Sequence, residues 1–294
     1  MNADFDRRVV TDEVEFWLGL SEVFFESFKI KKDPGPTWFL LNEVLRDTSG
    51  ITVGEATSAL TSAGVVRSKP AYDVTKYSKH LCSLGLLDAT GLDLEKHTFT
   101  VDAILRVGPR MEKGIDRYVG RVLELLFDRR TADWMLSNHS TRVVMNAIYD
   151  YMRGTYIPIW EKFLNDLAHV AAQKTKARQS IVFGYLRGNT EVFVLLHRLW
   201  EAHLDDDIGA GFNLADLCDL HSRIRVSSQT AIENCVERLC HYKILDGDAA
   251  ALLKLHEDQS PVFERYIPSF IASRLLFKEH LESCFVEGRQ AAAG

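Results

Sequence analysis

Apolar residues recur at helical spacing through most of the chain, and the clearest pattern lies in residues 212–246. Two apolar stripes are separated there by a polar turn at 222–225. Ser227 or Ser228 is placed to cap the second stripe by accepting a hydrogen bond from the first N–H groups of a helix. The apolar face of that second helix consists of Ile232, Cys235, Val236 and Leu239. Two helices joined by a short polar turn predict a helix-turn-helix.

The same pattern occurs earlier in the chain. Residues 72–88, YDVTKYSKHLCSLGLLD, align without a gap with residues 230–246, TAIENCVERLCHYKILD, at an offset of 158. Upstream, residues 51–60 match residues 212–221 in their apolar pattern at an offset of 161. This self-similarity indicates two copies of one motif class.

Each motif is followed by a segment that predicts a small β-hairpin, or wing, at residues 86–101 and 246–263, and long apolar helices flank both copies. We therefore expect a mainly α fold of tandem winged helix-turn-helix domains with small β-wings, joined and flanked by long packing helices. The expected divisions are a first winged-helix unit with the N-terminal helix at 1–108, a helical connector or pseudo-dimerisation region at 109–188, and a second winged-helix unit with the C-terminal helix at 189–294.

This order of elements resembles the winged helix-turn-helix of the multiple-antibiotic-resistance regulator (MarR) family. The resemblance covers residues 14–127 and again 148–280, and rests on element order and on the LCSLGLLD (81–88) and LCHYKILD (239–246) ends of the two recognition helices. It implies duplex DNA as the partner. It also implies a small aromatic or lipophilic effector near the aromatic helices around Trp17, Phe24, Phe28 and Trp160. Family members usually dimerise through terminal helices, so two copies in one chain imply an internal pseudo-dimer. Whether the chain also forms a homodimer stays open.

Charge is distributed unevenly along a chain of net charge −6. Residues 67–80 carry four cations and one anion, and residues 222–243 carry four cations and two anions. Both predicted recognition segments are thus locally basic, as is expected of a surface that contacts DNA phosphates. The recognition helices within them are predicted at 70–85 and 227–243. The predicted DNA contacts are Lys69, Tyr72, Lys76, Lys79 and His80 in the first copy, and Arg223, Arg225, Ser228, Gln229, Thr230, Asn234 and Arg238 in the second.

Other classes of protein find little support in the sequence. Five cysteines without C-x-x-C spacing argue against a disulfide framework and a zinc site. There is no secretory leader pattern, no apolar run long enough to span a membrane, and no nucleophile, metalloprotease or nucleotide-binding motif. We expect a cytoplasmic protein that is not an enzyme, with no catalytic residue, no metal, no cofactor and no membrane partner.

Two functions remain for such a chain. The first is a DNA-binding transcriptional regulator that reads duplex DNA with two recognition helices, under the control of a small effector. The alternative is a tandem winged-helix scaffold that binds a partner protein without contacting DNA, similar in plan to the acidic winged-helix subunits of bacterial chromosome-condensation complexes. The acidic net charge and cation-poor wings favour the scaffold, whereas the locally basic recognition segments favour DNA.

Overall fold

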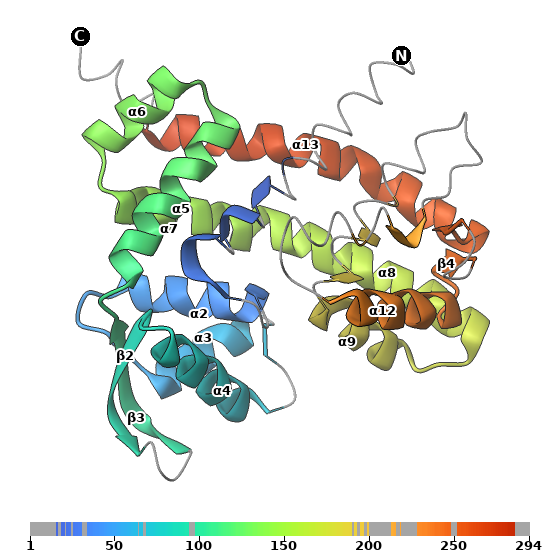
Figure 1. Ribbon diagram of the computed structural model, residues 1–294, viewed down its shortest axis with the longest axis horizontal. Coiled ribbons are helices and arrows are strands. Elements are labelled where there is room, and N and C mark those ends of the chain that lie inside the picture. The colour runs from blue at the N-terminus through green and yellow to red at the C-terminus, as the bar shows by residue number, and fades with distance from the viewer. Residues whose placement is uncertain are drawn as a thin grey trace. The chain divides into compact units, whose positions relative to one another are not determined.

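The computed structural model is mainly helical, with two small antiparallel sheets in its described part (Figure 1). This confirms the expected mainly α class. Contacts divide the chain into unit 1, residues 1–22 and 154–279, and unit 2, residues 23–153 and 280–294. The segment 109–188, expected as a connector, therefore contributes its first part to unit 2 and its second part to unit 1. The structure describes residues 16, 19–20, 22–24, 26–30, 34–63, 65–66, 69–93, 98–189, 191–192, 195–196, 199, 213–215, 218, 228–247 and 252–285.

The described part of unit 2 includes the three packed helices α2, α3 and α4 and a three-stranded antiparallel sheet of order β1-β3-β2. In that sheet Ile51 pairs with Leu105 and Leu87 pairs with Val107. Three further helices follow the sheet (Figure 1). The elements are α2 (Pro34–Arg46), β1 (Ile51–Thr52), α3 (Val53–Ser62), α4 (Pro70–Ser83), β2 (Leu87–Asp93), β3 (Thr98–Val107), α5 (Met111–Leu126), α6 (Arg129–Asn138) and α7 (Thr141–Tyr151).

Local sequence accounts for the ends of α3 and α4. Thr52 and Glu55 form a capping box at the start of α3, in which the Glu55 N–H donates to the Thr52 hydroxyl at 3.1 Å and the Thr52 N–H donates to the Glu55 carboxylate at 2.7 Å. Pro70 occupies the first turn of α4, where its missing N–H costs nothing. Gly85 follows α4 with a φ of +68°, a conformation that glycine adopts without strain.

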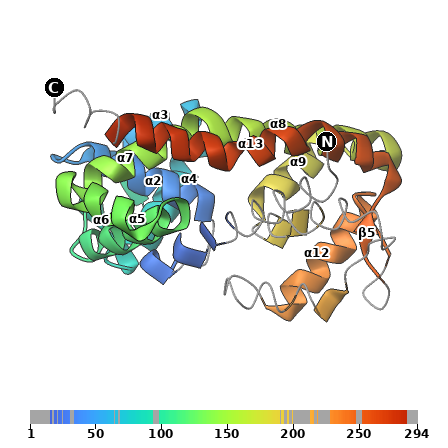
Figure 2. The same ribbon diagram turned by 90° about the horizontal axis from the view of Figure 1, so that it is seen from above.

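Unit 1 is built around aromatic packing between α8 (Ile157–Thr175) and α13 (Ser260–Phe285), which run alongside each other (Figure 2). The ring of Phe163 on α8 lies 5.2 Å from that of Phe263 and 5.6 Å from that of Phe270, centroid to centroid. The π-helix Met152–Tyr156 precedes α8, and Pro158 lies in the first turn of α8. The other elements are α9 (Gln179–Gly188), α12 (Gln229–His241), β4 (Leu245–Asp246), β5 (Lys254–Leu255) and the short 3-10 helix Glu257–Gln259.

The backbone that ends α4 recurs at the end of α12, at the offset of 158 residues found in the sequence. Gly85 and Lys243 both have positive φ, at +68° and +55°. The same pattern of three N–H to carbonyl bonds surrounds each of them. In unit 2 these bonds are Leu84 to His80, Gly85 to Cys82 and Leu86 to Leu81, and in unit 1 they are Tyr242 to Arg238, Lys243 to Cys240 and Ile244 to Leu239.

The correspondence continues through the β-hairpins. Leu87 pairs with Val107 in unit 2, and its counterpart Leu245 pairs with Leu255 in unit 1, so the second hairpin is shorter by ten residues. Beyond the hairpins the offset is therefore 148. At that offset Met111 near the start of α5 corresponds to Gln259 just before α13, and both side chains are fully buried. The two units thus share a helix, a left-handed cap, a hairpin and a following helix.

The two caps give a paired prediction. Gly85→Ala is expected to lower the free energy of unfolding by about 1 kcal/mol, because a Cβ disfavours the left-handed region, whereas Lys243→Gly is expected to raise it by about 1 kcal/mol. Urea denaturation followed by circular dichroism measures both. Gly184→Ala, within α9 where an added Cβ meets nothing, is the control and should stabilise by about 1 kcal/mol. A Gly85→Ala protein as stable as the control would contradict the cap.

Candidate nucleic-acid interface

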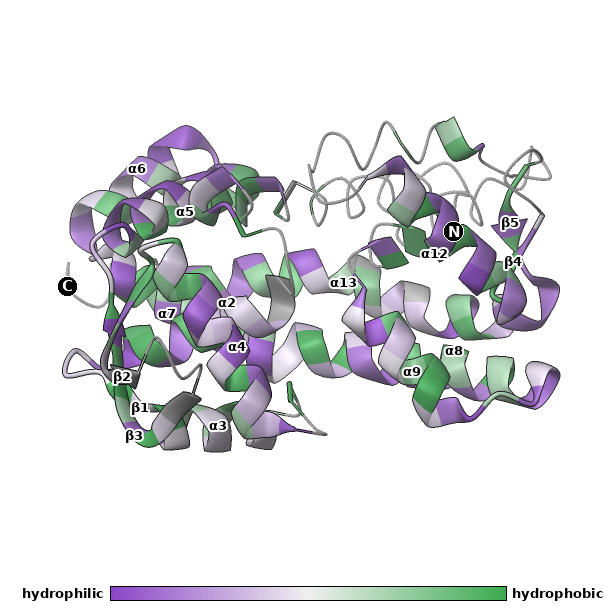
Figure 3. Ribbon diagram, turned by 60° about the horizontal axis from the view of Figure 1, so that its bottom comes forward, coloured by the Kyte–Doolittle hydropathy of each residue, from purple (hydrophilic) through white to green (hydrophobic). Residues whose placement is uncertain are grey.

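One side of α4 carries a stripe of polar and basic side chains, Tyr72, Lys76, Lys79 and Ser83, which we call the α4 stripe. Because these residues are three or four apart, they share one helical face. The buried residues Val74, Ser78 and Leu81 have the same spacing, but each follows a residue of the stripe by two positions. They therefore lie on the opposite face of the helix. Hydrophilic and hydrophobic residues accordingly alternate around α4 (Figure 3).

The α4 stripe is accessible over most of its length. Tyr72 has 67% of its surface exposed, Lys76 is exposed and Lys79 is half-buried. The Lys76 ammonium lies 5.4 Å from the centre of the Tyr77 ring, which positions the cation at the surface. Four of the residues predicted from the sequence, Lys69, Tyr72, Lys76 and Lys79, therefore lie on or at the start of one helix face.

The start of α4 adds to the positive character of this surface. Lys69 is exposed at the N-cap, and no side chain caps the helix there. Unpaired N–H groups and the helix dipole attract anions to such an end, although Asp73 in the first turn opposes this. A phosphate at this end would meet both the Lys69 ammonium and the backbone N–H groups.

His80 is placed less favourably for contact with a ligand. It lies between the α4 stripe and the buried face, its side chain is half-buried, and its Nε2 is shielded from solvent. The sequence pattern could not distinguish it from its exposed neighbours, because its burial depends on residues that pack against α4.

The predicted contacts of the second copy separate into two groups. Thr230, Asn234 and Arg238 are exposed and, being four residues apart, share one face of α12. Ser228 and Gln229 are engaged within the helix. The Ser228 hydroxyl caps α12 by accepting from the Ala231 N–H at 3.3 Å, and the Gln229 side chain donates to the Glu233 carboxylate at 3.0 Å.

Arg223 and Arg225 lie outside the described residues, as does Trp17. The other aromatic residues expected near an effector are packed against neighbouring rings. Phe24 and Phe28 lie 6.0 and 5.6 Å from Tyr118, and Trp160 lies 5.6 Å from Phe163, centroid to centroid. Phe24 and Phe28 are buried in the core of unit 2, whereas Trp160 of unit 1 is half-buried.

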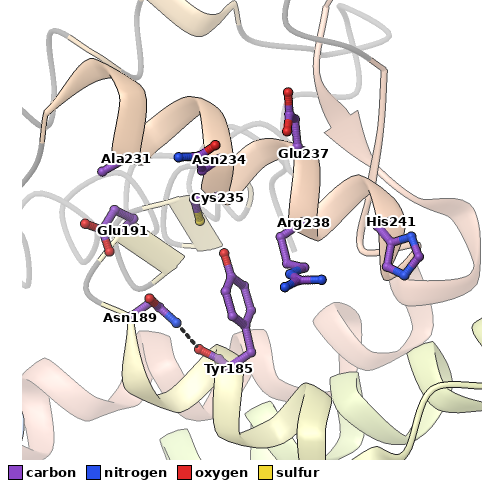
Figure 4. A pocket seen from close by; sticks show the side chains of 9 residues that line it. All are labelled: Tyr185, Asn189, Glu191, Ala231, Asn234, Cys235, Glu237, Arg238 and His241. Atoms are coloured by element: carbon purple, nitrogen blue, oxygen red, sulfur yellow. Dashed lines mark hydrogen bonds between the residues drawn. The ribbon is translucent and has the colours of Figure 1, made fainter.

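A pocket of about 600 Å³ in unit 1 lies between α12 and the residues at the end of α9. Figure 4 shows the Tyr185 hydroxyl directed toward Cys235 and the Arg238 side chain directed toward Tyr185. The Arg238 guanidinium lies 5.8 Å from the Tyr185 ring centre and 5.7 Å from that of Tyr242. The lining residues are Tyr185, Asn189, Glu191, Ala231, Asn234, Cys235, Glu237, Arg238 and His241.

The pair formed by Tyr185 and Cys235 remains protonated at neutral pH. Burial raises the pKa of the Tyr185 hydroxyl well above its usual range, and the neighbouring Cys235 and Glu191 raise it further while Arg238 opposes them. Burial also raises the pKa of the Cys235 thiol to about 12. A thiol held neutral is a poor nucleophile, so this pair offers hydrogen bonds and not covalent chemistry.

Most of the residues that line the pocket were not among the contacts predicted from the sequence. Glu237 and His241 could have been found, since they lie three and seven residues after Asn234 on the same helical face. Tyr185 and Asn189 had no signal, because they come from a helix more than forty residues earlier and reach α12 only through tertiary packing.

Within the described ranges, no three histidine, cysteine or acidic side chains converge to hold a metal ion. In the same residues, no helix has the length and apolarity that crossing a membrane demands. Comparisons of the chain with protein-family models, curated proteins and solved structures found no match.

Proposed function

We propose that the chain is a DNA-binding transcriptional regulator with two winged helix-turn-helix units, and that α4 is its principal DNA-contacting helix. The α4 stripe carries this proposal: cations and a tyrosine stand on the face of α4 opposite the core. The order α2, β1, α3, α4, β2, β3 supports it, since a winged helix-turn-helix has a helix pair followed by a hairpin.

The dimensions of α4 suit a major groove. Its 14 residues span about 21 Å, and the groove of B-DNA, roughly 12 Å wide, admits a helix. Lys69, Lys76 and Lys79 would contact phosphates and position the protein, while Tyr72 near the start of the helix would reach the base edges or sugars. The described part of the β2-β3 hairpin exposes Asp102 and Val101, so it adds little attraction for phosphate.

The two units would contact DNA unequally. At the offset of 158, Lys76 corresponds to Asn234 and Lys79 corresponds to Glu237. The helix α12 therefore lacks the paired lysines of α4, and its Arg238 already stacks on two tyrosine rings. Such a protein would favour an asymmetric operator. The small aromatic or lipophilic effector and a homodimer remain parts of the proposal that only the family resemblance supports.

Salt dependence of DNA binding tests the proposal. The affinity for a labelled mixed-sequence duplex, measured by fluorescence anisotropy, should fall with a log–log slope of about −0.9 for each phosphate neutralised. We expect a slope of about −3 from Lys69, Lys76 and Lys79, if each neutralises one phosphate. Contacts from a second helix would steepen the slope to between about −4 and −8. Absence of binding at about 50 mM salt would contradict the proposal.

A protein-interaction scaffold is the second candidate. Adjacent leucines on α13, Leu275 and Leu276, are 53% and 43% exposed, and the chain as a whole is acidic. Exposed apolar side chains grouped in this way favour a protein partner. This function would be favoured if a variant without the α4 lysines still co-purifies with its partner protein. It would also require that the unmodified chain does not bind DNA.

A further inference from the structure

The outer face of α12 lacks the lysines of the α4 stripe, although the two helices share their caps and following hairpins. At the offset of 158 residues, the four members of the α4 stripe correspond to Thr230, Asn234, Glu237 and His241. These residues of α12 are all exposed, and their spacing places them on one face of the helix. A hydroxyl, an amide, a carboxylate and an imidazole thus occupy the positions that hold a tyrosine, two lysines and a serine on α4.

The amide and the carboxylate at the centre of this face are available to a partner. Among the residues that the structure describes, neither Asn234 nor Glu237 has a partner in a hydrogen bond or an ion pair. The Arg238 guanidinium, by contrast, stacks on two tyrosine rings. Figure 4 shows the Glu237 side chain directed away from Tyr185 and the Arg238 side chain directed toward it.

The chemistry of these two side chains restricts what α12 could contact in DNA. The Glu237 carboxylate would repel phosphate oxygens, so it requires a hydrogen-bond donor in the groove. The amino group at N4 of cytosine is such a donor on the major-groove edge of a base pair. The Asn234 amide carries both a donor and an acceptor, and these match N7 and N6 of adenine.

The spacing of the two residues suits neighbouring base pairs. Three residues along an α-helix advance by about 4.5 Å along its axis. Successive base pairs of B-DNA are separated by about 3.4 Å. A helix that lies in the major groove would therefore place Asn234 and Glu237 over adjacent base pairs.

We infer that α12 reads base edges, with Asn234 on an adenine and Glu237 on a cytosine in the adjacent base pair. This inference rests on the proposed function, because it requires that the chain binds duplex DNA. It assigns different roles to the two helices. The lysines of α4 contribute affinity through phosphates, whereas α12 contributes sequence preference, so the operator contains an adenine and a cytosine in neighbouring base pairs where α12 binds.

The test is selection of duplexes from a random pool by the full chain, followed by fluorescence anisotropy with the selected duplex. Replacing either the A·T pair or the C·G pair should weaken binding about tenfold. Asn234→Ala should abolish the preference at the adenine position. Glu237→Gln should change the preference at the cytosine position from cytosine to adenine, because a glutamine amide matches the adenine edge.

Glu279→Gln is the matched control, since it makes the same change at an exposed position of unit 1 on α13. It should leave both base preferences unchanged, and circular dichroism confirms that each variant is folded. The inference is overturned, and the proposed function stands, if the chain binds mixed-sequence DNA with the expected salt dependence but the α12 variants alter no base preference. Absence of binding to any duplex would overturn both.

Discussion

Replacing Lys76 and Lys79 with glutamate is expected to weaken binding of mixed-sequence duplex DNA about a hundredfold at about 50 mM salt. Both lysines lie on the α4 stripe, opposite the buried face of the helix, so the change alters surface charge and leaves the core intact. Each lost phosphate contact also removes about 0.9 from the magnitude of the log–log salt slope, so the slope should become shallower by about two. Fluorescence anisotropy across a salt series measures both quantities.

A control with the same change in net charge separates the α4 stripe from a general effect of charge. Lys113→Glu combined with Arg129→Glu alters two exposed cations of unit 2 that lie on α5 and α6, away from α4. This variant should retain DNA affinity within a few fold, because exposed charges beyond about 10 Å are largely screened at 0.1 M salt. Equal weakening by the two variants would contradict a specific role for the α4 stripe.

Leu81→Ala is expected to lower the free energy of unfolding by about 3 kcal/mol. Leu81 has no exposed surface and lies on the inner face of α4, next to Val74 and Ser78. Removing three carbon atoms there loses buried apolar contact and leaves a cavity that the surrounding helices fill only in part. Urea denaturation followed by circular dichroism measures the change.

The matched control for Leu81 is Leu125 on α5, a leucine of the same unit that is 39% exposed. Leu125→Ala should cost less than about 1 kcal/mol, because it opens no cavity and alanine favours a helix. If the two alanine variants lost equal stability, α4 would not be packed through Leu81 as described. The lysines of the α4 stripe would then not be held in position by a helix packed against the core.

The sequence by itself determined the features that depend on neighbouring residues. Helical spacing of apolar positions predicted helices at 70–85 and 227–243, where the structure has α4 (Pro70–Ser83) and α12 (Gln229–His241). Ser228 was one of two serines proposed as the cap, and it accepts the capping bond. Such features are local, since they are set by side chains within about one helical turn.

The alignment of residues 72–88 with 230–246 also holds for the backbone that follows the two helices. Its offset is the one at which the left-handed caps at Gly85 and Lys243 correspond. It could not show that the second hairpin is ten residues shorter, because strand register depends on pairing between segments that are distant along the chain.

Only the tertiary structure decided which of the candidate residues are exposed and which are packed against other elements. All five predicted contacts of the first copy lie on α4 or at its start, yet packing half-buries His80 and leaves Tyr72 exposed. In the second copy, tertiary packing places the rings of Tyr185 and Tyr242 beneath Arg238 and forms a pocket beside α12. Periodicity assigns a residue to a helix face, but the elements that cover that face come from elsewhere in the chain. That is why the sequence alone predicted two helices with different polar faces, while only the structure shows which residues of each face are exposed and that α12 borders a pocket.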